Sequence, residues 1–322
     1  MNAICRSLTV CFASALLAAC AAAPLPAENP QQSPKERAPL TAVIVDPAHL
    51  SESRVVEVAD VGLAAPESVI HDVATDTYLV SNINGSPLAV DNNGFISKLY
   101  PDGRVIKLKF IEGGQNQVTL NAPKGMAIIG RTLYVADLNA VRGFDLDTGA
   151  PKSTVTLENA TFLNDLSAGP DGSLYVSDSG IKDGFAPSGT DAVYRIDTEG
   201  HPQSIASGTS LGQPNGVSAD ATGVWVVTFS GELYHLNNDG TRAASQKAPS
   251  GKLDGVVHLD ANSFLISSWD CGCVYRTSPG GAFVKVADNL TSPADINYDA
   301  KRNRLLVPIM LQGKLEAHSL SP

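Results

Sequence analysis

One short pattern recurs six times along the chain: a run of β-branched, aliphatic or aromatic residues that ends, in most copies, in a small or polar one. Turn signals such as Pro101-Asp102-Gly103 lie between the copies, and no amphipathic helix pattern appears after residue 54. Repeats of about 40 to 55 residues, each long enough for three or four strands, are typical of a β-propeller. The sequence therefore predicts an all-β fold, with residues 51–322 forming one six-bladed β-propeller. The six runs are Thr77–Asn82, Thr132–Asp137, Ser173–Asp178, Gly223–Thr228, Ser263–Ser268 and Arg304–Ile309.

The two ends of this predicted ring complement each other. Residues 54–58 form a short β-branched stretch before the first full repeat, whereas the last repeat ends at its third strand, near Leu320. An open ring would leave an unpaired strand edge. We therefore predict that the N-terminal strand supplies the outer strand of the sixth blade and closes the ring.

The inner strands of a propeller begin at one end of the central channel, so equivalent residues at their starts converge. At the second residue of each start, five of the six side chains are polar or charged. Carboxylates and amides in a channel are costly to desolvate unless they hold water or a cation, and their oxygens suit Ca²⁺, Mg²⁺ or Mn²⁺. The sequence favours a divalent cation, most of all Ca²⁺, and a hydrated channel without an ion is the alternative. The six residues are Glu67, Lys124, Asn164, Asn215, Asp254 and Ala294.

Four of these starts carry motifs that resemble a known family, the senescence marker protein/gluconolactonase/luciferin-regenerating enzyme family of six-bladed propellers. The resemblance covers residues 54–320. It implies that Glu67, Asn215 and Asp254 bind a divalent ion and that Asn164 contacts the substrate or a water on the ion. It also implies hydrolysis of a lactone, with Asp254 as general base. The motifs are Glu67-Ser68, Asn164-Asp165, Pro214-Asn215-Gly216 and Leu253-Asp254-Gly255.

The chain departs from the family pattern where a sugar acid would bind. Members that act on sugar-acid lactones carry an Arg two residues before the Asn-Asp motif, and Phe162 stands there in this sequence. Phe162 is therefore expected to contact a substrate other than gluconolactone. Lys124 enters the ring from the neighbouring blade, and we predict that it binds a substrate carboxylate or stabilises an oxyanion. The alternative for Lys124 is a salt bridge to Asp165 or Glu67.

The ends of the second strands are expected near the channel mouth. Asp178 and Trp269 are candidate substrate-binding residues there, together with Asn82, Asp137 and Asp270. Such residues also cap turns, Asp above all, and this second interpretation stays open.

The short stretch Cys271-Gly272-Cys273 lies in the same rim. In an oxidising compartment the two thiols can close a small disulfide that stiffens the wall of the mouth. A redox or metal role is the alternative, although two thiolates alone do not make a zinc site.

Two classes of function follow. The first is metal-assisted hydrolysis of a lactone or related small cyclic ester. The second is a non-enzymatic propeller that binds a ligand or a protein partner and carries a structural ion. No Gly-x-Ser-x-Gly elbow and no phosphate-binding Gly-x₄-Gly-Lys-Ser/Thr loop occurs in the sequence, so serine hydrolase and nucleotide hydrolase chemistry lack a motif.

The N-terminus has the layout of a secretion signal. A single positive charge is followed by an apolar run to residue 19, and Leu17-Ala18-Ala19-Cys20 resembles the lipobox of bacterial lipoproteins. We therefore expect a signal peptide over residues 1–19, a lipid on Cys20 and a flexible Pro-rich tether over residues 20–50. Ala21 after the cysteine favours the outer membrane of a bacterial envelope, facing the periplasm.

The overall charge limits the partners. The 322 residues include 33 Asp and Glu against 23 Lys and Arg, a formal net charge of −10, with no basic run carrying interleaved aromatics. Such a chain would be repelled by a phosphate backbone, so nucleic-acid binding is not expected. The expected partners are a small-molecule substrate and, through the lipid anchor only, a membrane, with the protein acting as a monomer.

Overall fold

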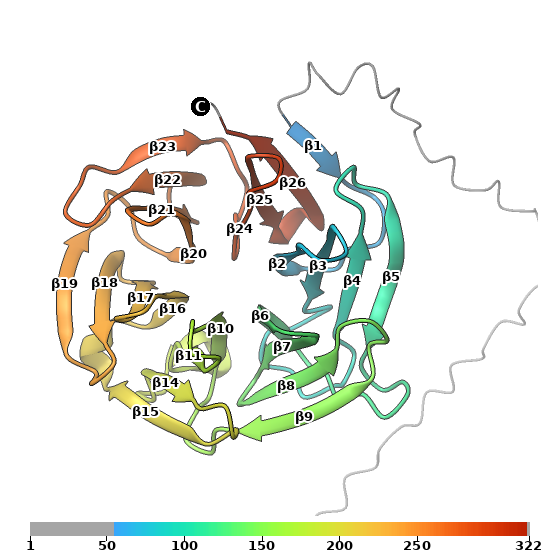
Figure 1. The fold of residues 1–322 in the computed structure, drawn as a ribbon, viewed down its shortest axis with the longest axis horizontal. Helices are drawn as coiled ribbons and strands as arrows, with labels where there is room; N and C mark the ends of the chain where they lie inside the picture. Colours follow the sequence, from blue (N-terminus) through green and yellow to red (C-terminus); the bar gives the residue numbers. More distant parts are fainter. Residues whose placement is uncertain (1–54, 321–322) are drawn as a thin grey trace, which may run out of the picture. The chain divides into compact units, whose positions relative to one another are not determined.

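The computed structural model describes residues 55–320, which form an all-β ring of six four-stranded antiparallel sheets (Figure 1). The predicted six-bladed propeller is thereby confirmed. The second strand of every blade coincides, within one residue, with one of the six repeated runs. The expected signal peptide, the lipidated Cys20 and the tether lie outside the described residues.

The blades follow one another in chain order, and the first strand named in each is the innermost. Blade 1 contains β2 (Pro66–Asp72), β3 (Thr77–Asn82), β4 (Phe95–Leu99) and β5 (Val105–Glu112). Blade 2 contains β6 (Pro123–Ile129), β7 (Thr132–Asp137), β8 (Ala140–Asp145) and β9 (Pro151–Thr156). Blade 3 contains β10 (Leu163–Ala168), β11 (Leu174–Asp178), β14 (Ala192–Ile196) and β15 (Pro202–Ser207).

The second half of the ring repeats this arrangement. Blade 4 contains β16 (Pro214–Ala219), β17 (Gly223–Thr228), β18 (Glu232–Asn237) and β19 (Arg242–Lys247). Blade 5 contains β20 (Leu253–Asp260), β21 (Ser263–Ser268), β22 (Cys273–Thr277) and β23 (Val284–Ala287). Blade 6 contains β24 (Asn297–Asp299), β25 (Arg304–Ile309), β26 (Lys314–Ser319) and β1 (Val55–Val58). Outside the blades are the hairpin β12 (Ile181–Lys182) and β13 (Ala186–Pro187), and the short 3₁₀ turns η2 (Asp183–Phe185), η3 (Thr209–Leu211) and η4 (Met310–Gln312).

Packing between neighbouring blades explains the repeated runs. Every residue of β3 and of β21 is buried, because a middle strand is covered by another blade on each face. Six apolar clusters fill the six spaces between adjacent blades; one, for example, joins Leu79 of blade 1 to Leu133 of blade 2. Outer strands such as β9 are largely exposed and carry mostly polar residues. The core is therefore a ring of layers rather than one central mass.

The N-terminal strand closes the ring, as predicted. β1 pairs antiparallel with β26, with Val55 opposite His318 and Val58 opposite Leu315, and Figure 1 shows the two strands side by side. The first described segment is therefore the outer strand of the last blade, which removes the unpaired edge.

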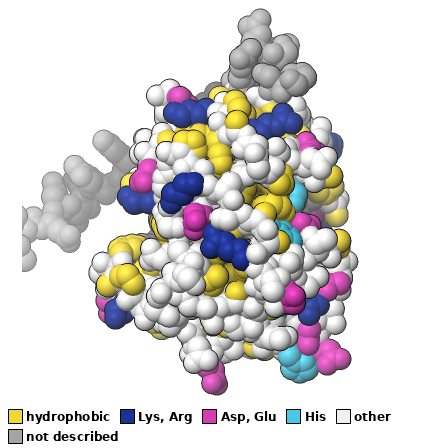
Figure 2. Space-filling view, turned by 90° about the vertical axis from the view of Figure 1, so that its left-hand side faces the viewer, with side chains coloured by type: hydrophobic (Ala, Val, Ile, Leu, Met, Phe, Trp, Pro, Cys, Tyr) yellow, Lys and Arg dark blue, Asp and Glu magenta, His cyan; other side chains and the backbone are white. Residues whose placement is uncertain are grey.

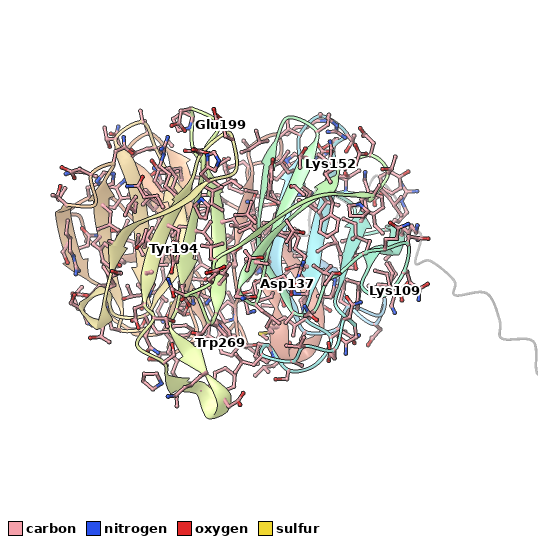
Figure 3. The ribbon with its side chains drawn as sticks, turned by 90° about the horizontal axis from the view of Figure 1, so that it is seen from below. Lys109, Asp137, Lys152, Tyr194, Glu199 and Trp269 are labelled. Carbon is pink, nitrogen blue, oxygen red and sulfur yellow. A yellow bond between two sulfur atoms is a disulfide. The ribbon has the colours of Figure 1, made fainter. Side chains whose placement is uncertain are left out.

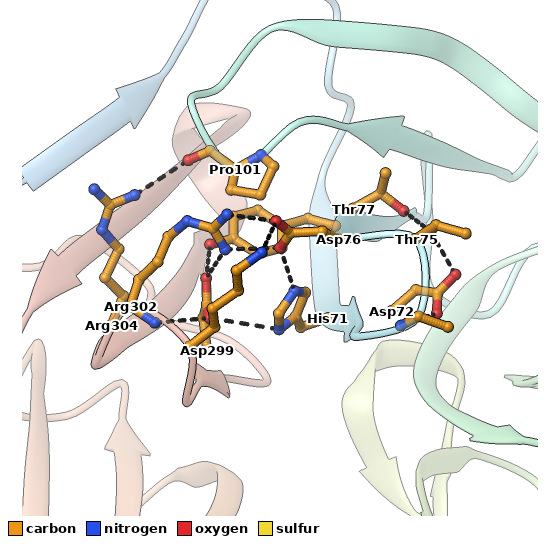
Figure 4. Close-up of polar contacts among 12 residues, drawn as sticks. His71, Asp72, Thr75, Asp76, Thr77, Pro101, Asp299, Arg302 and Arg304 are labelled. Atoms are coloured by element: carbon orange, nitrogen blue, oxygen red, sulfur yellow. Dashed lines mark hydrogen bonds and ion pairs between the residues drawn. The ribbon is translucent and has the colours of Figure 1, made fainter. Parts of the chain in front are cut away.

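A polar cluster adds a second connection between blades 1 and 6 (Figure 4). Arg302 donates to Asp76 of blade 1 at 2.6 Å and to Asp299 of its own blade at 2.9 Å. Tyr78 Oη donates to Asp299 at 2.5 Å across the same boundary. Arg302, followed by Lys301, holds the pKa of Asp76 well below its usual range by donating hydrogen bonds to its carboxylate.

Replacing Asp76 with Ala should therefore loosen the closure between the first and last blades. We expect the free energy of unfolding to fall by about 1 to 3 kcal/mol, because Arg302 and His71 both lose a partner in a mostly buried setting. Urea unfolding followed by circular dichroism measures this change. Asp288→Ala is the matched control, since the one ion pair of Asp288 within residues 55–320 is with the exposed Lys285, at 3.8 Å. Equal losses in the two variants would contradict the proposed connection.

The described residues contain no helix long and apolar enough to cross a membrane. On the part of the rim seen in Figure 2, which lies on the side of β19, acidic and basic side chains are interspersed with apolar ones. That part of the surface presents no extended patch of one charge.

Candidate functional site

In five of the six blades, the inner strand begins with a β-bulge. The register shifts between Pro66 and Val69 in blade 1, and equivalent shifts occur in blades 2 to 5. A bulge leaves residues unpaired and can re-aim their side chains, and it is common beside active sites. The bulged residues include the predicted ring positions Glu67, Lys124, Asn164, Asn215 and Asp254.

Serines in the second strands satisfy the backbone that these bulges leave free. The hydroxyl of Ser81 accepts from the Ser68 N–H at 2.9 Å, and Ser177 and Ser267 do the same for blades 3 and 5 at 3.0 and 2.8 Å. Ser177 and Ser267 also donate to backbone carbonyls of the next blade. The repeated Val-Ser or Ile-Ser of the sequence therefore holds the inner strands in the bulged form.

Glycine follows three of the ring residues, Lys124, Asn215 and Asp254, because adjacent inner strands approach very closely. A Cβ placed on Gly255 would lie 2.6 Å from Oδ1 of Asp295 and would overlap the backbone nitrogen of Ile296. A Cβ on Gly216 would overlap the backbone of the next inner strand in the same way. The Asn215-Gly216 and Asp254-Gly255 motifs thus have a packing reason in addition to any chemical one.

The ring residues converge on one end of the channel, which we call the site end. All are buried, and neighbouring starts are in contact: a Cβ on Gly125 or Gly216 would overlap the start of the next blade, and the Asp295 N–H donates to the Glu67 carbonyl at 2.9 Å. Trp269 lies at the end of the disc from which the β12–β13 hairpin projects, opposite the end that carries Lys152 and Glu199 (Figure 3). Trp269 Nε1 donates to Oδ2 of Asp254 at 2.6 Å, so this tryptophan belongs to the site end.

Two carboxylate oxygens of the site end are buried without any hydrogen-bond partner among the described residues: Oε2 of Glu67 and Oδ1 of Asp254. Orphaned buried acceptors are rare in folded proteins and call for a proton, a water or an ion. Burial raises the pKa of Glu67 well above its usual range, and the charge of Asp254 raises it further. Burial and the charge of Asp295 raise the pKa of Asp254 to about 8.

The two asparagines of the ring present oxygens to the same region. The side-chain nitrogen of Asn164 donates to Ser179 at 2.9 Å, and that of Asn215 donates to the carbonyl of Leu253 at 3.2 Å. Their amide oxygens accept no hydrogen bond from the described part of the chain. Each nitrogen is thus held by protein, which orients the oxygen for another ligand.

This donor set suits a hard divalent cation that is completed by other oxygens. Among residues 55–320, no three His, Cys, Asp or Glu side chains are grouped closely enough to hold an ion by themselves. An ion at Glu67 and Asp254 would therefore need the amide oxygen of Asn215 and water or substrate oxygens as well. Ca²⁺, which takes 6 to 8 oxygen ligands, accepts such mixed sets.

Lys124 forms neither of the salt bridges considered from the sequence. Its ammonium donates to the carbonyl of Ala122 at 3.1 Å and lies 4.3 Å from the ring centroid of Phe162. Burial lowers the pKa of Lys124 to about 8, against the opposing effect of the Glu67 charge. A lysine and an aromatic ring thus stand together at the site end.

Two further carboxylates line the channel, and the second residue of each strand start did not predict them. Asp165 and Asp295 occupy the third position, where the other blades have Ser or Gly, and both are buried. Asp165 accepts from the N–H of Leu166 at 2.6 Å and of Val217 at 2.7 Å, while Oδ2 of Asp295 accepts from Ser68 at 2.5 Å. Burial raises the pKa of Asp295 to about 7 and that of Asp165 well above its usual range. The third residue of each strand start, compared across the six blades, would have identified both carboxylates from the sequence.

Residues at the ends of the second strands bind backbone. Asp178 accepts from the N–H groups of Thr161, Phe162 and Gly180 at 2.9 to 3.2 Å. Asp137 and Asn82 accept backbone N–H groups in the same way in their own blades. This is the turn-capping interpretation of these residues, and it orders the loops that lead into the inner strands.

Cys271 and Cys273 form a disulfide, with Cα atoms 5.2 Å apart. The turn that contains them begins at Trp269, whose carbonyl accepts from the N–H of Gly272 at 3.2 Å. The disulfide therefore constrains the segment that presents the indole to Asp254.

No family model matches the sequence, and no curated protein sequence matches it. Among solved structures, a gluconolactonase from Xanthomonas campestris has 18% sequence identity and a TM-score of 0.63, over 83% of this chain and 89% of that one. Luciferin-regenerating enzyme has 14% identity and a TM-score of 0.61, over 82% of this chain and 94% of that one. Virginiamycin B lyase from Staphylococcus aureus has 13% identity and a TM-score of 0.59, over 83% of this chain and 99% of that one.

At these identities the likeness concerns the fold. Two of the three proteins are named as a gluconolactonase and a luciferin-regenerating enzyme, the names of the family whose motifs the strand starts resemble. The third is named as a lyase. The chain is accordingly a six-bladed β-propeller with the architecture that these gluconolactonase, luciferin-regenerating enzyme and lyase structures share.

Proposed function

We propose that this protein is a divalent-metal-dependent hydrolase of a lactone or related small cyclic ester, acting at the site end of the channel. The observation that carries the proposal is the pair of orphaned buried oxygens, Oε2 of Glu67 and Oδ1 of Asp254. Glu67, Asn215 and Asp254 would hold the ion, for which Ca²⁺ fits best. When bound, such an ion supplies Lewis-acid polarisation of an ester carbonyl.

The side chains around these ligands have separate tasks in the proposed reaction. Trp269 Nε1 donates to Oδ2 of Asp254, so Oδ1 would face the ion, and its second lone pair is placed to take the proton of the attacking water. The water oxygen bonds to the carbonyl carbon, the ring C–O bond breaks, and the leaving oxygen receives the proton that Asp254 took from the water, which gives a hydroxy acid. Asn164 and Lys124 orient the substrate, and the Lys124 ammonium stabilises negative charge as it develops on the carbonyl oxygen.

The identity of the residue beside Lys124 narrows the substrate. Phe162 is buried and offers an aromatic ring, not the guanidinium that sugar-acid members of the resembling family carry. The Xanthomonas protein is named as a gluconolactonase, and that substrate is stated for that enzyme. For this chain we propose a less hydroxylated lactone, which an aromatic wall accommodates better than a polyhydroxylated ring.

The proposal is tested by measuring bound metal in the purified full-length chain and then screening a panel of lactones with and without chelator. We expect stoichiometric divalent metal and turnover that chelation abolishes. The absence of metal affinity would overturn both the site and the mechanism. Bound metal without turnover, with Glu67→Gln lowering only thermal stability, would instead support the non-enzymatic propeller with a structural ion.

Lys124 offers a test of the substrate contact. We expect Lys124→Met to lower kcat/KM by about 10- to 100-fold, because a buried positive charge near the carbonyl oxygen is lost. The free energy of unfolding should not fall, since the variant removes a desolvated ammonium. Lys252→Met is the matched control, because Lys252 is exposed and pairs with Asp270 at 3.2 Å. Unchanged activity and ligand affinity in Lys124→Met would contradict the assigned role.

We further propose that the propeller works as a monomer in a bacterial cell envelope, anchored by a lipid on Cys20 to the outer membrane and facing the periplasm. The lipobox-like Leu17-Ala18-Ala19-Cys20 supports this placement, and so does the Cys271–Cys273 disulfide, which persists in oxidising compartments. Mass spectrometry of the mature N-terminus should find an acylated Cys20. A mature protein that begins at another residue would contradict the anchor.

A further inference from the structure

A cavity of about 540 Å³ opens at the end of the channel opposite the site end, which we call the far end. Turns between the first and second strands form its mouth, including Val73, Gly130 and Lys301. Its volume lies within the range of about 300 to 1,000 Å³ that is usual for small-molecule sites. Neither Glu67 nor Asp254 lines this cavity, but its inner end adjoins the proposed metal site, since the Asp295 N–H donates to the Glu67 carbonyl at 2.9 Å.

The wall of this cavity is an aliphatic collar to which every blade contributes. The residue that follows the third position of the strand start lines it in blades 2 to 6, and a neighbouring residue does so in blade 1. Such a collar favours the hydrocarbon part of a ligand. It consists of Ile70, Met126, Leu166, Val217, Val256 and Ile296.

The inner end of the cavity is acidic. Asp165 and Asp295 line it, with exposed fractions of 4% and 7%. Among the described residues neither carboxylate forms an ion pair, and no hydrogen bond reaches Oδ1 of Asp295. The cations at the mouth are engaged elsewhere, Arg131 by Asp72 and Lys301 by Asp76.

We propose that the far-end cavity binds an organic ammonium ion with an apolar body, such as an alkylamine. The ammonium would donate to Oδ1 of Asp295 and neutralise the acidic end, while the hydrocarbon part fills the collar. A buried carboxylate without a cation is costly, and a charge-assisted hydrogen bond removes that cost. A bare inorganic cation fits less well, because the collar residues offer it no oxygen ligands, and of the other lining oxygens Asp72 is paired with Arg131 and Ser218 is hydrogen-bonded to His258.

Calorimetric titration of the full-length chain with hexylammonium, hexanol and hexanoate tests this assignment. In the presence of chelator, we expect hexylammonium to bind at least about ten-fold more tightly than hexanol, the difference that one charge-assisted hydrogen bond supplies. Hexanoate should not bind. Equal affinities for the amine and the alcohol would reduce the site to an apolar cavity and overturn the proposal.

Two variants keep the test decisive. Asp295→Asn should reduce the preference for amine over alcohol about ten-fold, whereas Val256→Phe, which fills the collar, should weaken both ligands. Asp270→Asn at the site end should change neither affinity, since Asp270 is half-exposed and pairs with Lys252, and it does not line the far-end cavity. Hexylammonium binding that survives both Asp295→Asn and Val256→Phe in folded protein would place the amine elsewhere and overturn the assignment.

Discussion

Replacing Asp254 with Asn should lower kcat/KM for lactone hydrolysis by about 1,000-fold. The substitution keeps the size of the side chain but removes both a proton acceptor and one negative charge from the proposed ion site. Because Oδ1 of Asp254 is buried without a protein partner, its loss should cost little of the fold itself. Steady-state kinetics on the best lactone of the panel, at saturating metal, measures the effect.

The matched control for this variant is Asp270→Asn. Asp270 lies one residue after Trp269 but is half-exposed and contacts Lys252, so its loss should leave kcat/KM within about two-fold. If Asp254→Asn retained activity while Asp270→Asn lost it, the catalytic carboxylate would have to be sought on the rim. Equal activity in both variants would contradict the proposed chemistry.

The second large effect concerns stability and pH in metal-free protein. Burial raises the folded-state pKa of Asp254 to about 8 and of Asp295 to about 7, against 3.8 for an unperturbed Asp. Between these values the folded chain binds more protons than the unfolded chain. The free energy of unfolding should therefore fall as pH rises from about 4 to about 8, by up to about 1.4 kcal/mol per pH unit and carboxyl.

A divalent cation should reverse that loss, because it binds the deprotonated carboxylates. At a hundred-fold excess over its Kd, an ion that binds only the folded state adds about 2.7 kcal/mol, or roughly 5 to 10 °C in Tm. The stabilisation should be larger at pH 8 than at pH 5, since fewer protons compete for Glu67 and Asp254. Thermal melts in chelator and in Ca²⁺ across this range measure both trends. A metal-free Tm that rises with pH would contradict the buried-carboxyl account.

The repeated runs allowed the fold to be predicted because each blade uses the same local rule. A middle strand that is covered on both faces must be apolar along its whole length, so its run is visible in sequence without any partner. The closing strand at residues 55–58 was also predictable, since a ring of antiparallel sheets leaves one place for it.

The ring of polar residues was predictable in part. Equivalent positions in a closed ring of repeats converge, and this rule predicted from the sequence that Glu67, Asn215 and Asp254 lie near one another. The sequence did not indicate that Asp165 faces the channel, because the bulge of blade 3 directs two consecutive residues toward it and strict strand alternation counts only one. Asp295 lies before β24 begins and forms only a single bridge, with Ser68, so strand alternation does not apply to it. The sequence did not predict that Lys124 lies over the ring of Phe162. The spacing of residues along the chain does not show whether a lysine will contact an aromatic ring or form a salt bridge.

By itself, the sequence determined the architecture, the closure of the ring and which side chains can meet at the site end, because all three follow from repetition and strand pairing. Only the tertiary structure decided that two carboxylate oxygens are orphaned, that the indole of Trp269 holds Asp254, and that an aliphatic collar lines the far end of the channel. These features depend on distances between blades far apart in the chain. Such distances are set by close packing between neighbouring sheets, which no single repeat contains.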